Sequence, residues 1–140
     1  MADAVTSQTL SDGDRVTVIK LTNLSDGGGE SSVKKVDVSD LATSSSNGAT
    51  PSRVSITQIW YDIGGMRVSL EWAATTNVNI LTLGGSAAAG NVSGHMDFRS
   101  FGGIKNTEAS GVDGDIDLTT SGHTNLDHYS IILELKKKYT

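Results

Sequence analysis

The chain has 140 residues, which suits a single domain with its own core, and it contains no cysteine, so disulfides and thiolate metal sites are excluded. A net charge of -5 disfavours nucleic-acid binding, because contact with phosphates needs clustered Lys and Arg. No apolar run is long enough to cross a bilayer, and the first residues, MADAVTSQTL, lack the basic start and apolar segment of a secretory signal. We therefore expect no nucleic-acid partner and no membrane contact.

Alternating apolar and polar residues, separated by loops rich in Gly, Ser and Asn, predict about nine short strands. In chain order these strands are Val5 to Leu10, Arg15 to Asn23, Val33 to Val38, Val54 to Ile63, Met66 to Ala73, Val78 to Leu83, His95 to Phe101, Asp115 to Thr120 and His128 to Lys136. One turn of helix, capped by Ser39, is expected near Ser39 to Thr43. Strands at this spacing are typical of a sandwich or a barrel, and no linker divides the chain.

The N-terminus is expected to extend from the rest of the protein. We divide the chain into an N-terminal arm at residues 1–12 and a β-sandwich domain at residues 13–140. The arm alternates like a strand but has no turn partner of its own, so we expect its backbone hydrogen bonds to be made to another chain. Val5 and Leu10 are its candidate interface residues.

The stretch IWYDIGGMRVSLEW, residues 59–72, has two alternating runs around a pair of glycines. Glycine permits the positive φ of a two-residue turn, so the stretch predicts a hairpin. Its expected cross-strand neighbours are Ile63 with Met66, Tyr61 with Val68, Ile59 with Leu70, Thr57 with Trp72 and, on the other face, Asp62 with Arg67. The loop Ser121 to Asp127 predicts a second hairpin packed on the first. The expected core residues are Ile59, Tyr61, Val68, Leu70, Trp72, Ile131 and Leu133.

The other face of the first hairpin mixes apolar and polar residues. Val54, Ile56 and Trp60 share it with Gln58 and Asp62. Such a face is covered either by loops of the same chain or by a partner. The full set of candidate interface residues is therefore Val5, Leu10, Val54, Ile56 and Trp60.

No motif indicates catalysis, so we expect a protein that is not an enzyme and needs no cofactor. The chain has neither a Gly-x-Ser-x-Gly elbow nor a phosphate-binding Gly-Lys-Ser/Thr loop. The candidate metal ligands are His95, His123 and His128 for zinc, and Asp113, Asp115 and Asp117 for calcium. Neither set has the spacing of a known site, so we interpret the histidines as surface residues and the aspartates as a solvated strand face.

Five segments together carry a resemblance to a known family. They are AVTSQTLSDGDRVTVIKLTNLSDG, VKKVDVSDL, ITQIWYDIGGMRVSLEW, HMDFRSFGGIKN and GDIDLTTSGHTNLDHYSIILELKKK. In this order they resemble small virion structural proteins of tailed bacteriophages, especially marine ones. The resemblance covers most of the chain, and none of these motifs is a catalytic signature.

The resemblance implies a capsid decoration, or cement, protein. Such a protein binds the major capsid protein on the outside of the head, commonly as a homo-trimer, and is assembled in the host cytoplasm. We therefore expect an all-β, single-domain, two-sheet sandwich that is jelly-roll-like. Two alternatives remain open, namely a head-completion or tail structural protein and a β-sandwich carbohydrate-binding module. The second needs exposed aromatic rings, and Trp60 is the only tryptophan that the predicted core leaves free.

Overall fold

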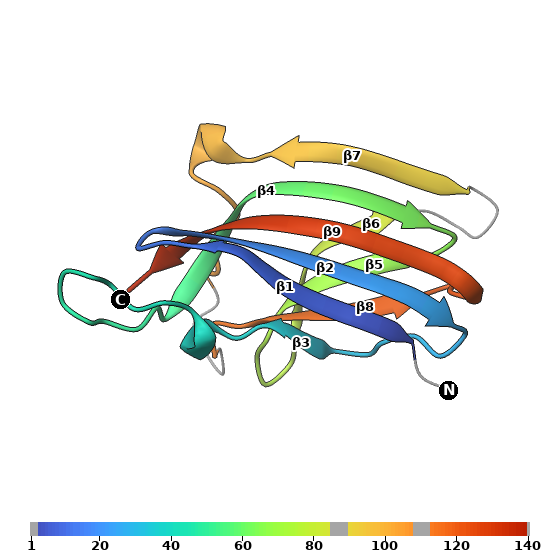
Figure 1. The fold of residues 1–140 in the computed structure, drawn as a ribbon, viewed down its shortest axis with the longest axis horizontal. Helices are drawn as coiled ribbons and strands as arrows, with labels where there is room; N and C mark the ends of the chain where they lie inside the picture. Colours follow the sequence, from blue (N-terminus) through green and yellow to red (C-terminus); the bar gives the residue numbers. More distant parts are fainter. Residues whose placement is uncertain (1–2, 85–89, 108–112, 140) are drawn as a thin grey trace.

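A computed structural model describes residues 3–84, 90–107 and 113–139. This part of the chain forms two antiparallel sheets packed face to face (Figure 1). The larger sheet has the order β1-β2-β9-β4-β7, and the smaller sheet has the order β3-β8-β5-β6. The strands are β1 (Ala4–Asp12), β2 (Val16–Asp26), β3 (Val33–Val36), β4 (Arg53–Gly64), β5 (Arg67–Trp72), β6 (Val78–Gly84), β7 (Asn91–Asp97), β8 (Ile116–Ser121) and β9 (Asn125–Lys138). The short 3-10 helices η1 (Val38–Asp40) and η3 (Arg99–Phe101) lie in connections.

The strand pairing is that of a jelly roll with one added strand. β2 pairs with β9 and β4 with β7 in the larger sheet, while β3 pairs with β8 and β5 with β6 in the smaller sheet. The chain from β2 to β5 therefore runs against the chain from β6 to β9 as one long hairpin, rolled so that its strands are shared between two sheets. β1 is added at the edge beside β2. The predicted all-β, jelly-roll-like sandwich of about nine strands is confirmed.

Two local predictions need adjustment. The strand expected from His95 to Phe101 begins earlier, at Asn91, and ends at Asp97, where η3 follows. The expected helical turn is η1, and its cap is Asp37 in place of Ser39, because the Asp37 carboxylate accepts a hydrogen bond from the Ser39 backbone N–H at 3.0 Å.

Both predicted hairpins are wrong. β4 and β5 belong to different sheets, so the glycine turn between them carries the chain from the larger sheet to the smaller one. Asp62 consequently lies beside Ser93 and Ser130 and not opposite Arg67. β8 and β9 are divided between the sheets in the same way. The apolar faces are nevertheless the predicted ones, since strands facing each other across a sandwich both turn their apolar sides inward.

The turn after β4 requires glycine at its second position. Gly65 has a φ of 79°, in the left-handed region that side chains disfavour. A Cβ atom there would also lie 2.2 Å from Oδ1 of Asp127, near the start of β9. The glycine pair thus predicts a tight turn correctly, although the turn joins two sheets.

Val54 and Ile56 lie in the core, which corrects their prediction as interface residues. The register of β4 against β9 shifts between Ile56 and Gln58, because Ile56 pairs with Leu135 while Gln58 pairs with Glu134. Such a bulge reverses the alternation of side chains. Val54 and Ile56 before the bulge therefore point inward, as Ile59 does after it, and each of the three has no exposed surface.

The core fills the space between the sheets with aliphatic side chains from almost every strand. The predicted core residues are buried, except that Tyr61 is half-buried and packs at the margin. The largest fully buried side chains are Leu21, Ile56, Ile59, Ile63, Met66, Leu70, Ile116, Leu118, Tyr129, Ile131, Leu133 and Leu135. Each buried aliphatic side chain contributes about 1.5–3 kcal/mol, so this core accounts for a fold without disulfides.

The N-terminal strand has a partner within its own chain. β1 pairs with β2 from Ala4 opposite Leu24 to Asp12 opposite Thr17, so the prediction that its hydrogen bonds are made to another chain is wrong for one edge. The other edge has no neighbouring strand within the described residues. The turn between β1 and β2 is fixed by the buried ammonium of Lys137, which donates to Asp12 Oδ1 and to the Gly13 carbonyl, each at 2.5 Å. Residues 1 and 2 of the expected arm lie outside the described residues.

Candidate functional site

The first candidate surface is the free edge of β1. Val5 and Leu10 are 40% and 46% exposed, and every residue of the strand is exposed. Between Ala4 and Leu10 there is no charged residue and no proline, and the single bulge lies at the far end, between Thr9 and Ser11. Natural edge strands are usually blocked by such residues, because an open edge pairs with other chains. This edge can therefore accept a strand from a second molecule.

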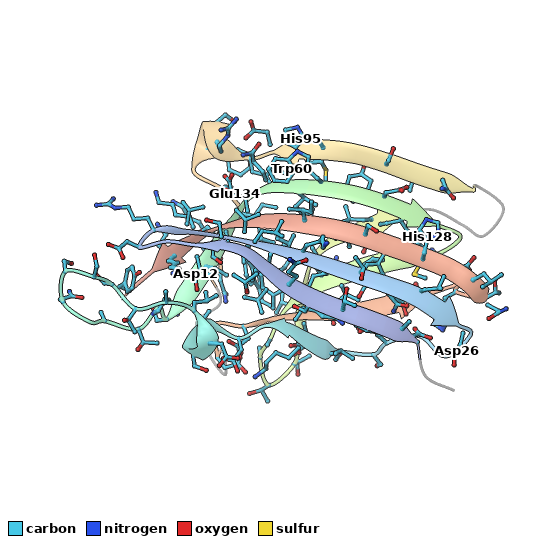
Figure 2. The ribbon with its side chains drawn as sticks, in the orientation of Figure 1. Asp12, Asp26, Trp60, His95, His128 and Glu134 are labelled. Carbon is cyan, nitrogen blue, oxygen red and sulfur yellow. The ribbon has the colours of Figure 1, made fainter. Side chains whose placement is uncertain are left out.

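The second candidate surface is a hollow of about 510 Å³ on the outer face of the larger sheet. Trp60, the remaining predicted interface residue, lies in its wall beside His95, as Figure 2 shows. The complete lining is Lys20, Trp60, Tyr61, Asp62, Ser93, Gly94, His95, Ser130 and Ile132. Four adjacent strands, β2, β9, β4 and β7, contribute these residues, so the hollow depends on the register of the whole sheet.

The strand register arranges the lining in two rows. In one row, Trp60 lies between His95 of β7 and Ile132 of β9. In the next row, Asp62 lies between Ser93 and Ser130. Serine side chains are much shorter than indole or isoleucine side chains, so the second row is lower than the first. The hollow therefore has an apolar wall and a polar floor.

A chain of hydrogen bonds fixes the ring that supports Trp60. The Trp60 and His95 rings are stacked, with centroids 4.9 Å apart and planes 4° from parallel. Nε2 of His95 lies 2.9 Å from Oε1 of Gln58, whose amide nitrogen donates to Glu134 Oε2 at 3.0 Å. Because that amide oxygen is an acceptor, Nε2 of His95 carries the proton. The Thr57 hydroxyl donates to the other Glu134 oxygen at 2.8 Å, which leaves the carboxylate little freedom to move.

The three histidines lie in separate places. His95 supports Trp60, while Nε2 of His123 lies 3.0 Å from the Gly28 carbonyl oxygen and ties the glycine-rich loop after β2 to the turn after β8. His128 lies on β9, opposite Gly64. Among the residues that the structure describes, no group of three or more His, Cys, Asp or Glu side chains is placed to hold a metal ion.

The interpretation of Asp115 and Asp117 as a solvated face is wrong. Both side chains are buried and have partners. Asp115 accepts a hydrogen bond from the Val38 backbone N–H at 2.8 Å and pairs with the Lys34 ammonium at 2.7 Å. Asp117 accepts from the Asn77 amide at 2.9 Å. These carboxylates attach the chain around η1, and the turn after β5, to β8.

A buried charged cluster closes one end of the sandwich. The Glu30 and Lys35 side chains, 6% and 4% exposed, form an ion pair. Glu30 Oε1 also accepts hydrogen bonds from the Tyr129 hydroxyl at 2.6 Å and from the Asn23 amide at 2.7 Å. Burial, and then the hydrogen bond to Glu30, raise the pKa of the Tyr129 hydroxyl well above its usual value. The cluster joins β2, β3 and β9, so its role is structural.

Asp3 fixes the start of β1 to the same end. Its carboxylate accepts hydrogen bonds from the Asn23 side chain and from the backbone N–H groups of Asp26 and Gly29, each at 3.1 Å. Partial burial by itself would raise the pKa of Asp3, but these hydrogen bonds outweigh it and lower the pKa to about 2. The N-terminal strand is thereby attached at both of its ends.

Comparisons with protein-family models, curated proteins and solved structures found no match to this chain. None of the helices in the described ranges has the length and apolarity that spanning a membrane requires. The fold and the two candidate surfaces are therefore the basis for a functional proposal.

The sequence placed Trp60, Gln58 and Asp62 on one face correctly, but it did not predict the hollow. The hollow also needs His95 and Ser93 from β7 and Ser130 from β9, and their positions follow from pairings between distant strands. One signal in the sequence indicates a binding surface at this place. The large aromatic residue Trp60 alternates with the polar residues Gln58 and Asp62 on a strand face that no predicted element packs against.

Proposed function

We propose that this protein is a non-enzymatic structural protein of a tailed-bacteriophage virion. In this proposal it binds the major capsid protein on the outer surface of the capsid as a decoration, or cement, protein and stabilises the head. Support comes from the resemblance of the five sequence segments and from a jelly-roll fold whose buried charged groups serve structural contacts. Its location would be the capsid exterior, after assembly in the host cytoplasm.

The observation that carries the proposal is the unblocked edge of β1. A strand added to this edge gains backbone hydrogen bonds without any particular sequence, which suits a protein that assembles in many copies. Val5 and Leu10 add apolar contact along the same strand. We propose a homo-trimer, because a closed ring repeats one interface and leaves no β1 edge open.

Sedimentation of the double variant Val5→Lys/Leu10→Lys tests this proposal. Lysines on an edge strand oppose pairing with another chain, and both positions are exposed, so the domain should fold normally. The unmodified protein should sediment as a trimer and co-sediment with expanded capsids of the same virus, while the variant should be monomeric and remain in solution. Phe101→Lys is the control, since Phe101 is 62% exposed and lies in η3, beyond the opposite edge of the sheet.

Two other results would point to other functions. A monomer that does not bind expanded capsids would remove the support for decoration and favour a head-completion or tail role. Saturable binding of a glycan by a protein that does not bind capsids would favour the second candidate function, a carbohydrate-binding module. The hollow beside Trp60 is the observation in favour of that candidate.

A further inference from the structure

The hollow beside Trp60 contains polar groups that the protein itself does not use. Within the part of the chain that the structure describes, the side chains of Lys20, Asp62, Ser93 and Ser130 form no hydrogen bond or ion pair with other residues. By contrast, His95, Gln58 and Glu134 next to them are bonded to one another. The lining thus offers a free carboxylate, a free ammonium and two free hydroxyls beside an apolar wall.

We infer that this hollow binds a neutral saccharide. A pyranose ring has an apolar face of C–H groups, which packs on aromatic and aliphatic surface such as that of Trp60 and Ile132. Its hydroxyls are donors and acceptors at once, so they can donate to Asp62 and accept from Lys20 and the serines. The volume lies within the range of about 300–1,000 Å³ that is usual for small-ligand sites.

The charges of the lining favour this ligand over two others. A phosphate would be attracted by Lys20 but repelled by Asp62, which lies in the same hollow. A planar aromatic ligand would use the Trp60 wall, but it has few groups for a floor that carries a carboxylate and two hydroxyls. A saccharide uses both the wall and the floor.

The wall of the hollow is arranged before a ligand arrives. The hydrogen bonds from Glu134 through Gln58 to His95 hold the imidazole ring, and that ring holds the indole of Trp60 parallel to it. A side chain that is already ordered loses less conformational entropy when a ligand binds.

This inference rests on the second candidate function and is independent of capsid binding. Trp60 is on β4, and β9 and β2 separate it from β1 in the larger sheet. An interface along the β1 edge therefore leaves the hollow accessible. The Val5→Lys/Leu10→Lys protein should accordingly bind saccharides as well as the unmodified protein does.

The experiment titrates the full chain with neutral saccharides. The probes are glucose, galactose, mannose, N-acetylglucosamine and their common disaccharides, with adenosine and inorganic phosphate as competing ligand classes. Binding is followed by calorimetry and by the fluorescence of Trp60 in a Trp72→Phe background, since the chain has two tryptophans and Trp72 is buried. We expect saturable binding of at least one saccharide, with a dissociation constant in the millimolar range.

Three variants locate the site. By calorimetry, Trp60→Ala and Asp62→Asn should each lower the affinity about tenfold or more, because they remove the stacking surface and the hydroxyl acceptor. Leu24→Ala is the matched control, since Leu24 lies on the same outer face but outside the hollow, and it should bind like the unmodified protein. Unchanged circular dichroism would show that the variants fold.

Three results would overturn the inference. They are the absence of binding by any saccharide well above millimolar concentration, binding of adenosine or phosphate in place of saccharides, and saccharide binding that survives either Trp60→Ala or Asp62→Asn. None of these results bears on the sedimentation test, so the two proposals can fail separately.

Discussion

Leu70 lies in the middle of β5 and has no exposed surface. Leu70→Ala should lower the free energy of unfolding by about 2–5 kcal/mol, because it removes buried methyl groups and leaves a cavity between the sheets. Urea denaturation measures this change. Leu24→Ala, at a side chain that is 50% exposed, should change stability by no more than about 0.5 kcal/mol. A loss below that value for Leu70→Ala would contradict the position of Leu70 in the core.

The ion pair of Glu30 and Lys35 is buried, so its two charges depend on each other. Glu30→Gln should cost about 3–5 kcal/mol, because it leaves the Lys35 ammonium buried without a counter-charge. Adding Lys35→Met removes that charge and should recover much of the loss. Chemical denaturation of both variants measures the difference. If the double variant were less stable than Glu30→Gln, the uncompensated charge of Lys35 would not be the cause of the stability lost in Glu30→Gln.

Asp3 should give the protein an acid-sensitive contribution to stability. Its pKa in the folded protein is about 2, below the ordinary value of 3.8, so the unfolded chain takes up the proton first as the pH falls. The stabilisation is therefore complete above about pH 4 and is lost as the pH falls through 2. Asp3→Asn should lower the melting temperature at pH 6, and its difference from the unmodified protein should shrink towards pH 2.

Asp40→Asn is the control for Asp3, because Asp40 is exposed in η1, away from the start of β1. It should leave the dependence of the melting temperature on pH unchanged. A difference between Asp3→Asn and the unmodified protein that stays constant from pH 6 to pH 2 would contradict the role of the Asp3 charge.

At the scale of strands, alternation predicted which side of each strand is apolar but not which strands pair. Met66, Val68, Leu70 and Trp72 point into the core as predicted. Their inward direction is the same whether β5 pairs with β4 or faces it across the sandwich. The hairpin was the simpler interpretation of a short glycine turn. In the jelly roll most consecutive strands lie in different sheets, so β4 and β5 do not form a hairpin. Which strands share a sheet depends on the packing of the whole chain.

The bulge in β4 explains the error at Val54 and Ile56. A strict period of two places them with Trp60 on the outer face. One extra residue near Thr57 reverses the alternation and buries them, and no glycine or proline in the strand marks that position. Asp115, just before β8, and Asp117, within it, were misplaced for a related reason, since their partners Lys34 and Asn77 are distant in sequence.

The removal of residues 1–10 tests whether β1 is dispensable for folding. Strands β2 to β9 already form a complete jelly roll, and the shortened chain keeps Asp12, which pairs with Lys137. We expect a cooperative thermal transition at a lower temperature, because the contacts of Asp3 and the β1–β2 hydrogen bonds are lost. Circular dichroism during heating measures it. A gradual, non-cooperative change would show that the fold depends on β1.

At the scale of the molecule, the structure joins a conventional scaffold to two separate surfaces. The scaffold follows from composition and alternation, which the sequence displays directly. The surfaces depend on strand order. Among the described strands β1 lies last in its sheet, which leaves its outer edge without a neighbour there. The hollow exists only because four strands align their residues. The order of the strands in the sheets therefore could not be predicted from the sequence pattern, and neither could the two surfaces.

The distribution of charge across the molecule leads to a prediction about metal ions. In the described part of the chain, several acids are neutralised by cations of the protein itself, namely Asp12 by Lys137, Glu30 by Lys35, Asp97 by Arg99 and Asp115 by Lys34. A carboxylate with a protein cation and hydrogen-bond donors needs no divalent ion to balance its charge. Treatment with a chelator should therefore leave the melting temperature unchanged, as scanning calorimetry can measure. A marked drop that calcium or zinc reverses would contradict this prediction and reopen the assignment of the aspartates and histidines.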